Sequence, residues 1–225
     1  MSPAAWVTGH AHLLPPHGLA LDAACGRGRH ALWLASAGCS VVALDRDVEA
    51  VEQLQRDASV RRLPIIAAVR DLESGSRSLG TGLFNTIVVV HYLHRPLFPS
   101  LLAALRPGGL LIYETFTRKQ AARGKPTNPD FLLREGELRS LVEPLEILDW
   151  REGEFEGRDV ASVVAKRLNG EYGGNGFHRR GNGGNGDERY EERICMNPRS
   201  SPFHRFSVCE NRFLRPLRPS SPQPP

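Results

Sequence analysis

Four polar side chains gather directly after an apolar run of this 225-residue sequence, and their types suit proton transfer. The run covers residues 84–90, and the polar side chains are His91, Tyr92, His94 and Arg95. A neutral imidazole accepts protons near neutral pH, so histidines at such a place are candidate bases. Because these positions fall within five residues, they cannot all face one point. We expect His91 and Tyr92 to line the reaction site, His94 to be a possible base, and Arg95 to be structural.

A second group of chemically useful residues lies between Leu19 and Asp47. Asp22 ends a short apolar run, and Asp45 ends the apolar, β-branched run that begins at Ser40. Between them, the turn at residues 25–28 contains two glycines, which let a ligand approach the backbone closely. The pattern predicts a strand, a glycine turn, a helix and a second strand. Ligands bind outside the carboxyl ends of strands in an open α/β sheet, so both acids should face one crevice.

Two interpretations of this unit compete. The segment 26–31, Gly-Arg-Gly-Arg-His-Ala, fits the G-x-G-x-x-[G/A] dinucleotide fingerprint, which favours an NAD(P)-dependent oxidoreductase. Asp22 opposes that interpretation, because a carboxylate before the turn would repel a pyrophosphate. A cationic amino-acid ligand without phosphate, such as S-adenosylmethionine (SAM), suits the two acids better.

The unit resembles the class I SAM-dependent methyltransferases. Their first motif matches Leu21-Asp22-x-x-Cys25-Gly26-x-Gly28, and their second matches residues 41–45. A Leu-Arg-Pro-Gly-Gly turn at residues 105–109 precedes an apolar run, as in that family. Arg29-His30 replaces the third glycine of many members, a variant similar to the tellurite-resistance-like branch. The resemblance implies SAM contacts from one set of residues: Asp22, Ala23, Cys25, Gly26, Gly28, Asp45, Arg46, Asp71, Leu72 and His91. In the family an acid such as Asp71 commonly bonds the adenine amino group, although a solvated turn acid is an open alternative here.

The remaining apolar patterns predict an α/β fold with helices on both faces of a Rossmann-like sheet. Strands are expected near residues 19–22, 40–45, 63–69, 84–90, 110–113, 145–150 and 159–166. The last two, joined by an acidic loop at residues 152–157, should form an antiparallel hairpin, which distinguishes the methyltransferase sheet from the all-parallel dinucleotide fold. We expect a helix over residues 4–14 that covers the cofactor or packs at the sheet edge. The polar loop 117–131 is a candidate substrate lid or a merely solvated basic loop.

Composition divides the chain near Leu168. Residues 169–225 contain 8 glycines, 7 prolines, 9 arginines and 6 acids with few apolar residues, which predicts a disordered tail after a methyltransferase domain at residues 1–168. The net charge of +4 falls largely on this tail, so no nucleic-acid groove is implied. Four cysteines without a C-x-x-C pair indicate a reducing compartment. No run is long enough to span a membrane and no secretory pattern is present, so a cytoplasmic protein is expected.

The sequence therefore predicts an enzyme that transfers a methyl group from SAM to an unidentified, small-molecule acceptor. No N/D-P-P-Y/F motif follows residues 84–90, which counts against methylation of adenine or glutamine nitrogens. The histidines show no metal-ligand spacing, and neither a Walker loop nor a nucleophile elbow is present. Two alternatives stay open: an NAD(P)-dependent oxidoreductase and a non-catalytic SAM-fold binding module. The oligomeric state cannot be read from the sequence.

Overall fold

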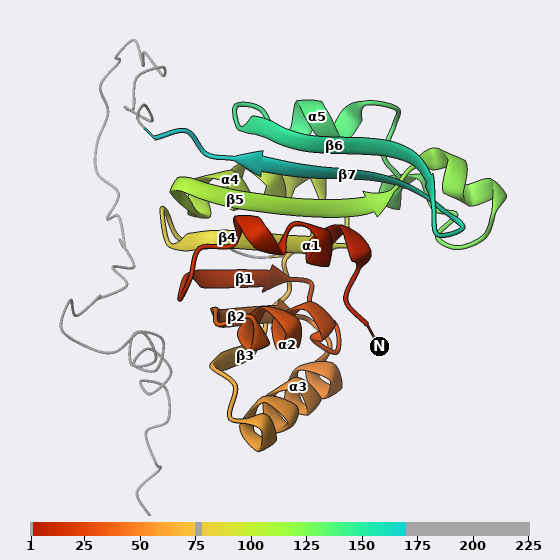
Figure 1. The fold of residues 1–225 in the computed structure, drawn as a ribbon. Coiled ribbons are helices and arrows are strands. Elements are labelled where there is room, and N and C mark those ends of the chain that lie inside the picture. Colours follow the sequence, from red (N-terminus) through yellow and green to blue (C-terminus); the bar gives the residue numbers. More distant parts are fainter. Residues whose placement is uncertain (1, 75–77, 170–225) are drawn as a thin grey trace, which may run out of the picture. The chain divides into compact units, whose positions relative to one another are not determined.

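A computed structural model describes residues 2–74 and 78–169 (Figure 1). Its strands are β1 Leu19–Ala23, β2 Ser40–Asp45, β3 Ile65–Val69, β4 Phe84–Val90, β5 Leu105–Phe116, β6 Glu146–Phe155 and β7 Arg158–Lys166. Its α-helices are α1 Ala5–Gly9, α2 Arg29–Ser36, α3 Val48–Arg61, α4 Phe98–Ala104 and α5 Glu137–Leu141. Short 3₁₀ helices cover η1 Ala11–Leu13, η2 Arg95–Leu97, η3 Arg118–Ala122 and η4 Pro129–Phe131. The tail was predicted at residues 169–225, and all of it except Asn169 lies outside the described residues.

The seven strands form one sheet in the order β3-β2-β1-β4-β5-β7-β6 (Figure 1). The pairs among β1 to β5 are parallel, whereas β7 is antiparallel to both β5 and β6. The predicted seven-stranded sheet with a terminal antiparallel hairpin is thus confirmed. Successive strands are added to one side of β1 up to β3 and then to its other side from β4, so the topological switch point lies between β1 and β4. A ligand crevice is therefore expected at the carboxyl ends of these two strands.

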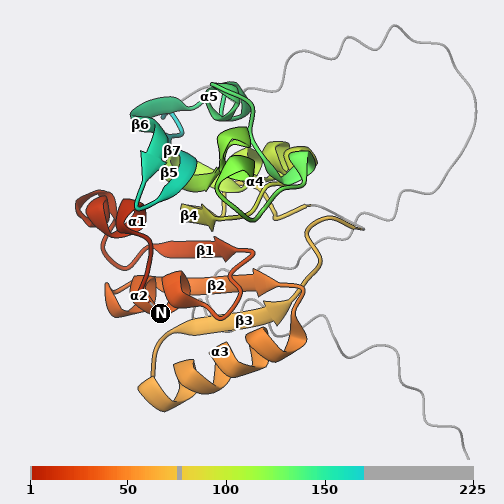
Figure 2. The same cartoon turned by 90° about the vertical axis from the view of Figure 1, so that its right-hand side faces the viewer.

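Apolar side chains alternate between the two faces of the sheet, and each face has its own helices. One layer packs α4 and α5 against strand residues such as Leu21, Ile87 and Leu111. The other packs α1, α2 and α3 against the residues that alternate with them, such as Ala20 and Val88. Figure 2 shows α1 and α2 on the side of the sheet away from α4. Central strands with both faces covered explain the near-continuous apolar run of β4.

Two strands are longer than the sequence pattern predicted. β5 begins at Leu105 rather than Leu110, because the Pro-Gly-Gly segment is part of the strand. The segment forms an irregularity in the pairing with β4, where the register shifts between Phe84 and Thr86. A side chain on Gly109 would lie 3.0 Å from the Phe84 carbonyl oxygen, so glycine allows this close approach. β6 continues through the expected acidic loop to Phe155, and only Glu156 and Gly157 turn the hairpin, both with positive φ.

The N-terminal helix is shorter than predicted. α1 ends at Gly9, and η1 continues the turn only to Leu13. Trp6 and Val7 are buried in the layer formed with α2, so the segment packs at the side of the sheet. Between β3 and β4 the described residues form no helix.

Candidate functional site

A cavity of about 330 Å³ opens at the carboxyl ends of β1, β2, β3 and β4, beside the topological switch point between β1 and β4. We call it the cofactor cleft. Ala24 follows β1, Asp45 ends β2, Asp71 follows β3, and His91 follows β4. The sheet thereby brings together side chains that are separated by up to 67 residues in the sequence.

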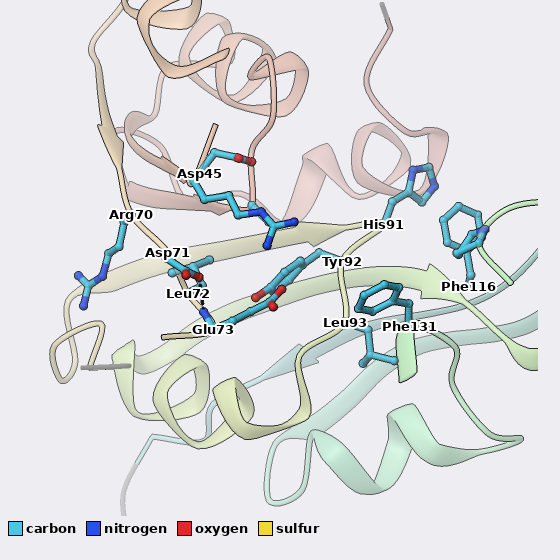
Figure 3. A pocket seen from close by; sticks show the side chains of 13 residues that line it. Asp45, Arg70, Asp71, Leu72, Glu73, His91, Tyr92, Leu93, Phe116 and Phe131 are labelled. Carbon is cyan, nitrogen blue, oxygen red and sulfur yellow. Dashed lines mark hydrogen bonds between the residues drawn. The ribbon is translucent and has the colours of Figure 1, made fainter. Parts of the chain in front are cut away.

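The cleft has two chemically different ends (Figure 3). Asp71, Leu72 and the Tyr92 ring lie at one end, and His91 and Phe116 lie at the other. The sequence interpretation placed His91 and Tyr92 together at a reaction site. They do line the same cavity, but their side chains diverge, and Tyr92 points toward the Asp71 end.

The glycine turn after β1 uses its backbone N–H groups internally. The Gly26 N–H donates to Asp45 Oδ2 at 2.6 Å, the Cys25 N–H donates to the Leu44 carbonyl, and the Gly28 N–H donates to the Cys25 carbonyl. A pyrophosphate-binding turn instead directs such N–H groups at the ligand. These three groups are already engaged, so the turn is not arranged to hold a diphosphate.

Asp22 does not occupy the position expected for it. We expected its carboxylate to face the crevice, but the side chain is only 1 % exposed and Oδ2 accepts a hydrogen bond from the Ala31 N–H of α2 at 2.9 Å. Burial raises its pKa to about 7, against the lowering effects of the Ala31 hydrogen bond and the Arg29 charge. The carboxylate therefore supports the first turn of α2 from below, where a dinucleotide fold would leave room for phosphate.

Two neighbouring residues that were expected to contact SAM, Ala23 and Gly28, also do not line the cleft. Ala23 is fully buried in the sheet, and Ala24, with φ of 57°, is the residue that lines the cleft. Gly26 faces open space, because a Cβ there would meet no atom within 4 Å. Gly28 does not face a ligand, since a Cβ there would lie 2.4 Å from Leu54 of α3. One glycine is thus open to a ligand, and the other lets α3 pack closely.

His91 is held in an unusual conformation between charged groups. Its φ is 60°, and its N–H donates to the Glu114 carbonyl at 2.8 Å. Its ring stacks on Phe116 with centroids 4.6 Å apart, and Arg29 and Arg158 each approach one ring nitrogen at 3.5 Å. Burial and these two cations lower its pKa to about 4, so the imidazole is neutral at pH 7. Left-handed backbone of this kind is costly for non-glycine residues and is concentrated at functional sites.

The other two candidate catalytic residues differ from His91. Tyr92 has a buried hydroxyl without a hydrogen-bond partner among the described residues, and its pKa is raised by burial and by Glu73 and Asp71. His94 does not line the cleft; its buried Nε2 also has no partner in the part of the chain described. The structure does not bring His94 to the side chains that form the cleft.

Asp71 and Asp45 both organise backbone near the cleft as well as lining it. Asp71 accepts hydrogen bonds from the Glu73 N–H and the Ser74 hydroxyl, both at 2.8 Å, which lower its pKa. Asp45 accepts from Asp47 N–H at 3.0 Å in addition to its bond with the glycine turn. Asp71 therefore behaves partly as the turn acid that was the alternative interpretation.

The sequence did not single out several residues of the cleft wall. These are Ala24, Arg70, Glu73, Leu93, Pro126 and Phe131. Pro126 and Phe131 come from the segment that was a candidate lid, and Phe131 is 48 % exposed. Position in a polar loop was the only available signal for them.

Arg95 fixes the end of this lid, as expected for a structural residue. Its guanidinium bonds Glu137 at 2.7 and 2.9 Å and the carbonyl oxygens of Asp130 and Leu132. At the other end of the lid, Arg123 pairs with Asp159 and Glu154 of the terminal hairpin. The segment is thus tied to η2 near its end and to the terminal hairpin at Arg123, and its Pro126 and Phe131 line the cleft.

The described residues contain no cluster of three or more metal-ligating side chains. None of the helices described at residues 2–74 and 78–169 is both long and apolar enough to cross a membrane.

Comparison with known proteins agrees with this geometry. Residues 20–109 match a family model described as a methyltransferase domain. Among curated proteins, Hemagglutinin 1 of Eikenella corrodens is 28 % identical over 138 residues, which is 59 % of this chain and 45 % of that protein. The chain thus spans less than half the length of this relative.

Solved structures share the fold at low sequence identity. TehB from Haemophilus influenzae matches with a TM-score of 0.63 and 20 % identity, over 73 % of this chain and 62 % of that one. A SAM-dependent methyltransferase from Methanosarcina mazei matches with a TM-score of 0.60 and 20 % identity, over 76 % of this chain and all of that one.

The strand order and the position of the cleft identify the fold as that of the class I SAM-dependent methyltransferases. Residues 20–109 match a methyltransferase-domain model, and solved SAM-dependent methyltransferases share the fold of the described chain.

Proposed function

We propose that this chain transfers a methyl group from SAM to a small molecule, with SAM bound along the cofactor cleft. The observation that supports this most is the use of the glycine-turn N–H groups by Asp45 and by neighbouring backbone carbonyls. A cleft that offers carboxylates and engaged amides suits a cation with a ribose better than a diphosphate. The NAD(P)-dependent alternative is disfavoured for the same reason.

The two ends of the cleft suggest how SAM would be oriented. Asp71, Leu72 and the Tyr92 hydroxyl offer hydrogen-bonding groups and an apolar wall for the adenine. Asp45, at the end of β2, would accept hydrogen bonds from the ribose hydroxyls. Asp22 is buried and accepts from the Ala31 N–H of α2, so it would influence the amino-acid portion of SAM without direct contact. Arg46 is exposed at the rim and completes the proposed cofactor residues.

When bound, SAM supplies a methyl group already activated by the sulfonium. The chain then has to position an acceptor and, where necessary, remove its proton. His91 lines the end of the cleft opposite the proposed adenine site, and its imidazole is neutral at pH 7. His91 is thus the proposed base, and His94, which does not line the cleft, is not needed in that role. Phe116 fixes the His91 ring by stacking.

Isothermal titration with SAM, its demethylated product S-adenosylhomocysteine and NADH tests the proposal. We expect micromolar binding of the first two and none of NADH. Asp45→Asn should weaken SAM binding by about 10- to 100-fold, because hydrogen bonds to a charged acceptor contribute about 1.5–3 kcal/mol. Glu52→Gln on the exposed face of α3 is the control and should not change it. Tight NADH binding without SAM binding would refute the assignment.

A second candidate is a non-catalytic binding module that retains the fold. The name of the curated relative, Hemagglutinin 1, denotes a binding activity of that protein. Incubation with methyl-labelled SAM and cell extract distinguishes the two, since only the enzyme yields a labelled product while SAM binds in both cases.

A further inference from the structure

A second cavity, of about 270 Å³, meets the cofactor cleft at His91, which lines both. We call it the arginine pocket. Three arginines line it: Arg29 from α2, Arg151 from β6 and Arg158 from β7. The carboxylates in its wall are Glu114 and Glu156. With His91 neutral, cations therefore outnumber anions in this wall.

One of the three arginines is already neutralised. Arg151 donates to Glu114 at 2.9 Å and to the Ser162 hydroxyl at 3.2 Å. Its guanidinium also lies over the Trp6 and Phe155 rings, 4.6 and 4.1 Å from their centroids. This Arg151–Glu114 pair is a fixed structural part of the pocket wall.

Arg29 and Arg158 have no such compensation. Neither forms an ion pair with a carboxylate within 4.0 Å among the residues that the structure describes, and Arg158 contacts His91 Nε2 at 3.5 Å. Arg29 contacts the Ser2 carbonyl at 3.3 Å and His91 Nδ1 at 3.5 Å. Both contacts with the imidazole are longer than the usual range of roughly 2.7–3.2 Å.

The two contacts with His91 also cannot both be hydrogen bonds. A neutral imidazole has one N–H and one lone pair, whereas a guanidinium only donates. One arginine therefore faces the N–H of the ring and leaves its own N–H groups without an acceptor there. An anion in the pocket would accept from both guanidinium groups and remove this mismatch.

The His91 end of the cofactor cleft is, in contrast, aromatic. Phe116 stacks on the imidazole, and the half-exposed Phe131 of η4 lines the same cleft. An inorganic oxyanion would leave these rings unused. An organic molecule could place an apolar body against them while its acidic group reaches past His91.

We propose that the methyl acceptor is an organic acid whose carboxylate is anchored by Arg29 and Arg158 and whose apolar body lies against Phe116 and Phe131. This inference rests on the proposed methyltransferase function. The anchor would present a protonated oxygen or nitrogen atom of the acceptor beside His91. In the transfer, that atom forms a bond to the methyl carbon, the methyl–sulfur electron pair stays on sulfur as a thioether, and the acceptor proton passes to the imidazole.

The anchor also affects the base. The charges of Arg29 and Arg158 lower the pKa of His91, and a carboxylate bound between them would offset that effect. Binding of the acceptor would thereby make His91 a stronger base at the time it is needed.

Probe binding to the full chain saturated with S-adenosylhomocysteine tests the inference, with benzoate, its neutral isostere benzamide, and sulfate. We expect benzoate to bind at least tenfold more tightly than either other probe. Arg158→Gln and Arg29→Gln should each weaken benzoate binding at least tenfold, and Arg158→Lys should retain part of it. Arg56→Gln, an exposed arginine of α3, is the matched control.

Three results would overturn the inference: no saturable benzoate binding, equal binding of benzamide or sulfate, or unchanged affinity in both glutamine variants. Binding of S-adenosylhomocysteine, measured in the same titrations, tests the proposed function separately. If it binds and benzoate does not, only the acceptor assignment fails. The labelled product from extract gives a second readout: it should be retained on an anion exchanger as an acid, and a neutral methyl ester would contradict the anchoring role.

Discussion

Asp22→Asn should make the protein more stable at pH 8 and leave its stability nearly unchanged at pH 4. The pKa of Asp22 is about 7 in the folded protein, whereas the ordinary value of an aspartate that is not buried, as in the unfolded chain, is 3.8. Between these values the folded state holds a proton that the unfolded state has released. Stability therefore falls as the pH rises from about 4 to 7, and is constant with respect to this group above 7.

The magnitude follows from the size of the shift. Each pKa unit corresponds to about 1.4 kcal/mol, so the shift of Asp22 corresponds to about 4 kcal/mol as an upper bound. Asparagine preserves the acceptor for the Ala31 N–H and never ionises, so the variant does not lose stability as the pH rises from about 4 to 7. Other titrating groups are present in both proteins, so they cancel in the difference.

The assay is urea unfolding of the wild type and the variant at pH 4, 6 and 8. The difference in the free energy of unfolding should grow with pH and level off above 7. Glu52→Gln, which removes an exposed carboxylate, should show no such trend. A pH-independent difference, or a variant less stable at pH 8, would refute the reasoning that burial dominates the environment of Asp22. If Asp22 influences the amino-acid portion of SAM as proposed, the affinity for SAM should rise with pH near 7 in the wild type and lose that dependence in the variant.

Three further changes probe the turn, the adenine end and the lid. Gly28→Ala should destabilise the fold by about 3 kcal/mol in urea unfolding, because of its positive φ and the overlap with Leu54. Tyr92→Phe should raise the thermal midpoint of the ligand-free protein, since it removes a buried unpaired hydroxyl, and should weaken S-adenosylhomocysteine binding. Arg123→Gln should increase hydrogen exchange in residues 118–131 without lowering the global midpoint, because it releases the lid from Asp159.

Matched controls accompany these variants. Gly26→Ala has the same backbone strain but open space around the new methyl group, so it should cost only about 1 kcal/mol. Arg118→Gln removes an exposed lid arginine and should leave exchange unchanged. Equal destabilisation by the two glycine variants would contradict the overlap of Gly28 with Leu54. A lower midpoint for Tyr92→Phe would contradict an unpaired hydroxyl, and unchanged exchange in Arg123→Gln would contradict the role of its pair with Asp159.

The sequence by itself determined the order of strands and helices along the chain and the end of the sheet at which the cofactor cleft opens. Local patterns were sufficient because a strand buried on both faces needs a near-continuous apolar run, as in β4, and because Asp45 ends one such run and His91 follows another. The terminal hairpin was predicted from two strand-like segments, residues 145–150 and 159–166, joined by a short Gly-containing link, although its turn needed only Glu156 and Gly157.

Only the tertiary structure decided which way each side chain points. Asp22 and Gly28 match a ligand-binding motif in sequence, yet one supports α2 and the other accommodates α3, because packing between neighbouring elements fixes their surroundings. The meeting of Arg29 and Arg158 at His91 joins segments 129 residues apart along the chain and depends on the antiparallel return of β7. Long-range contacts of this kind leave no periodicity in the sequence, so the chemistry of the proposed acceptor site emerges only when the sheet is assembled.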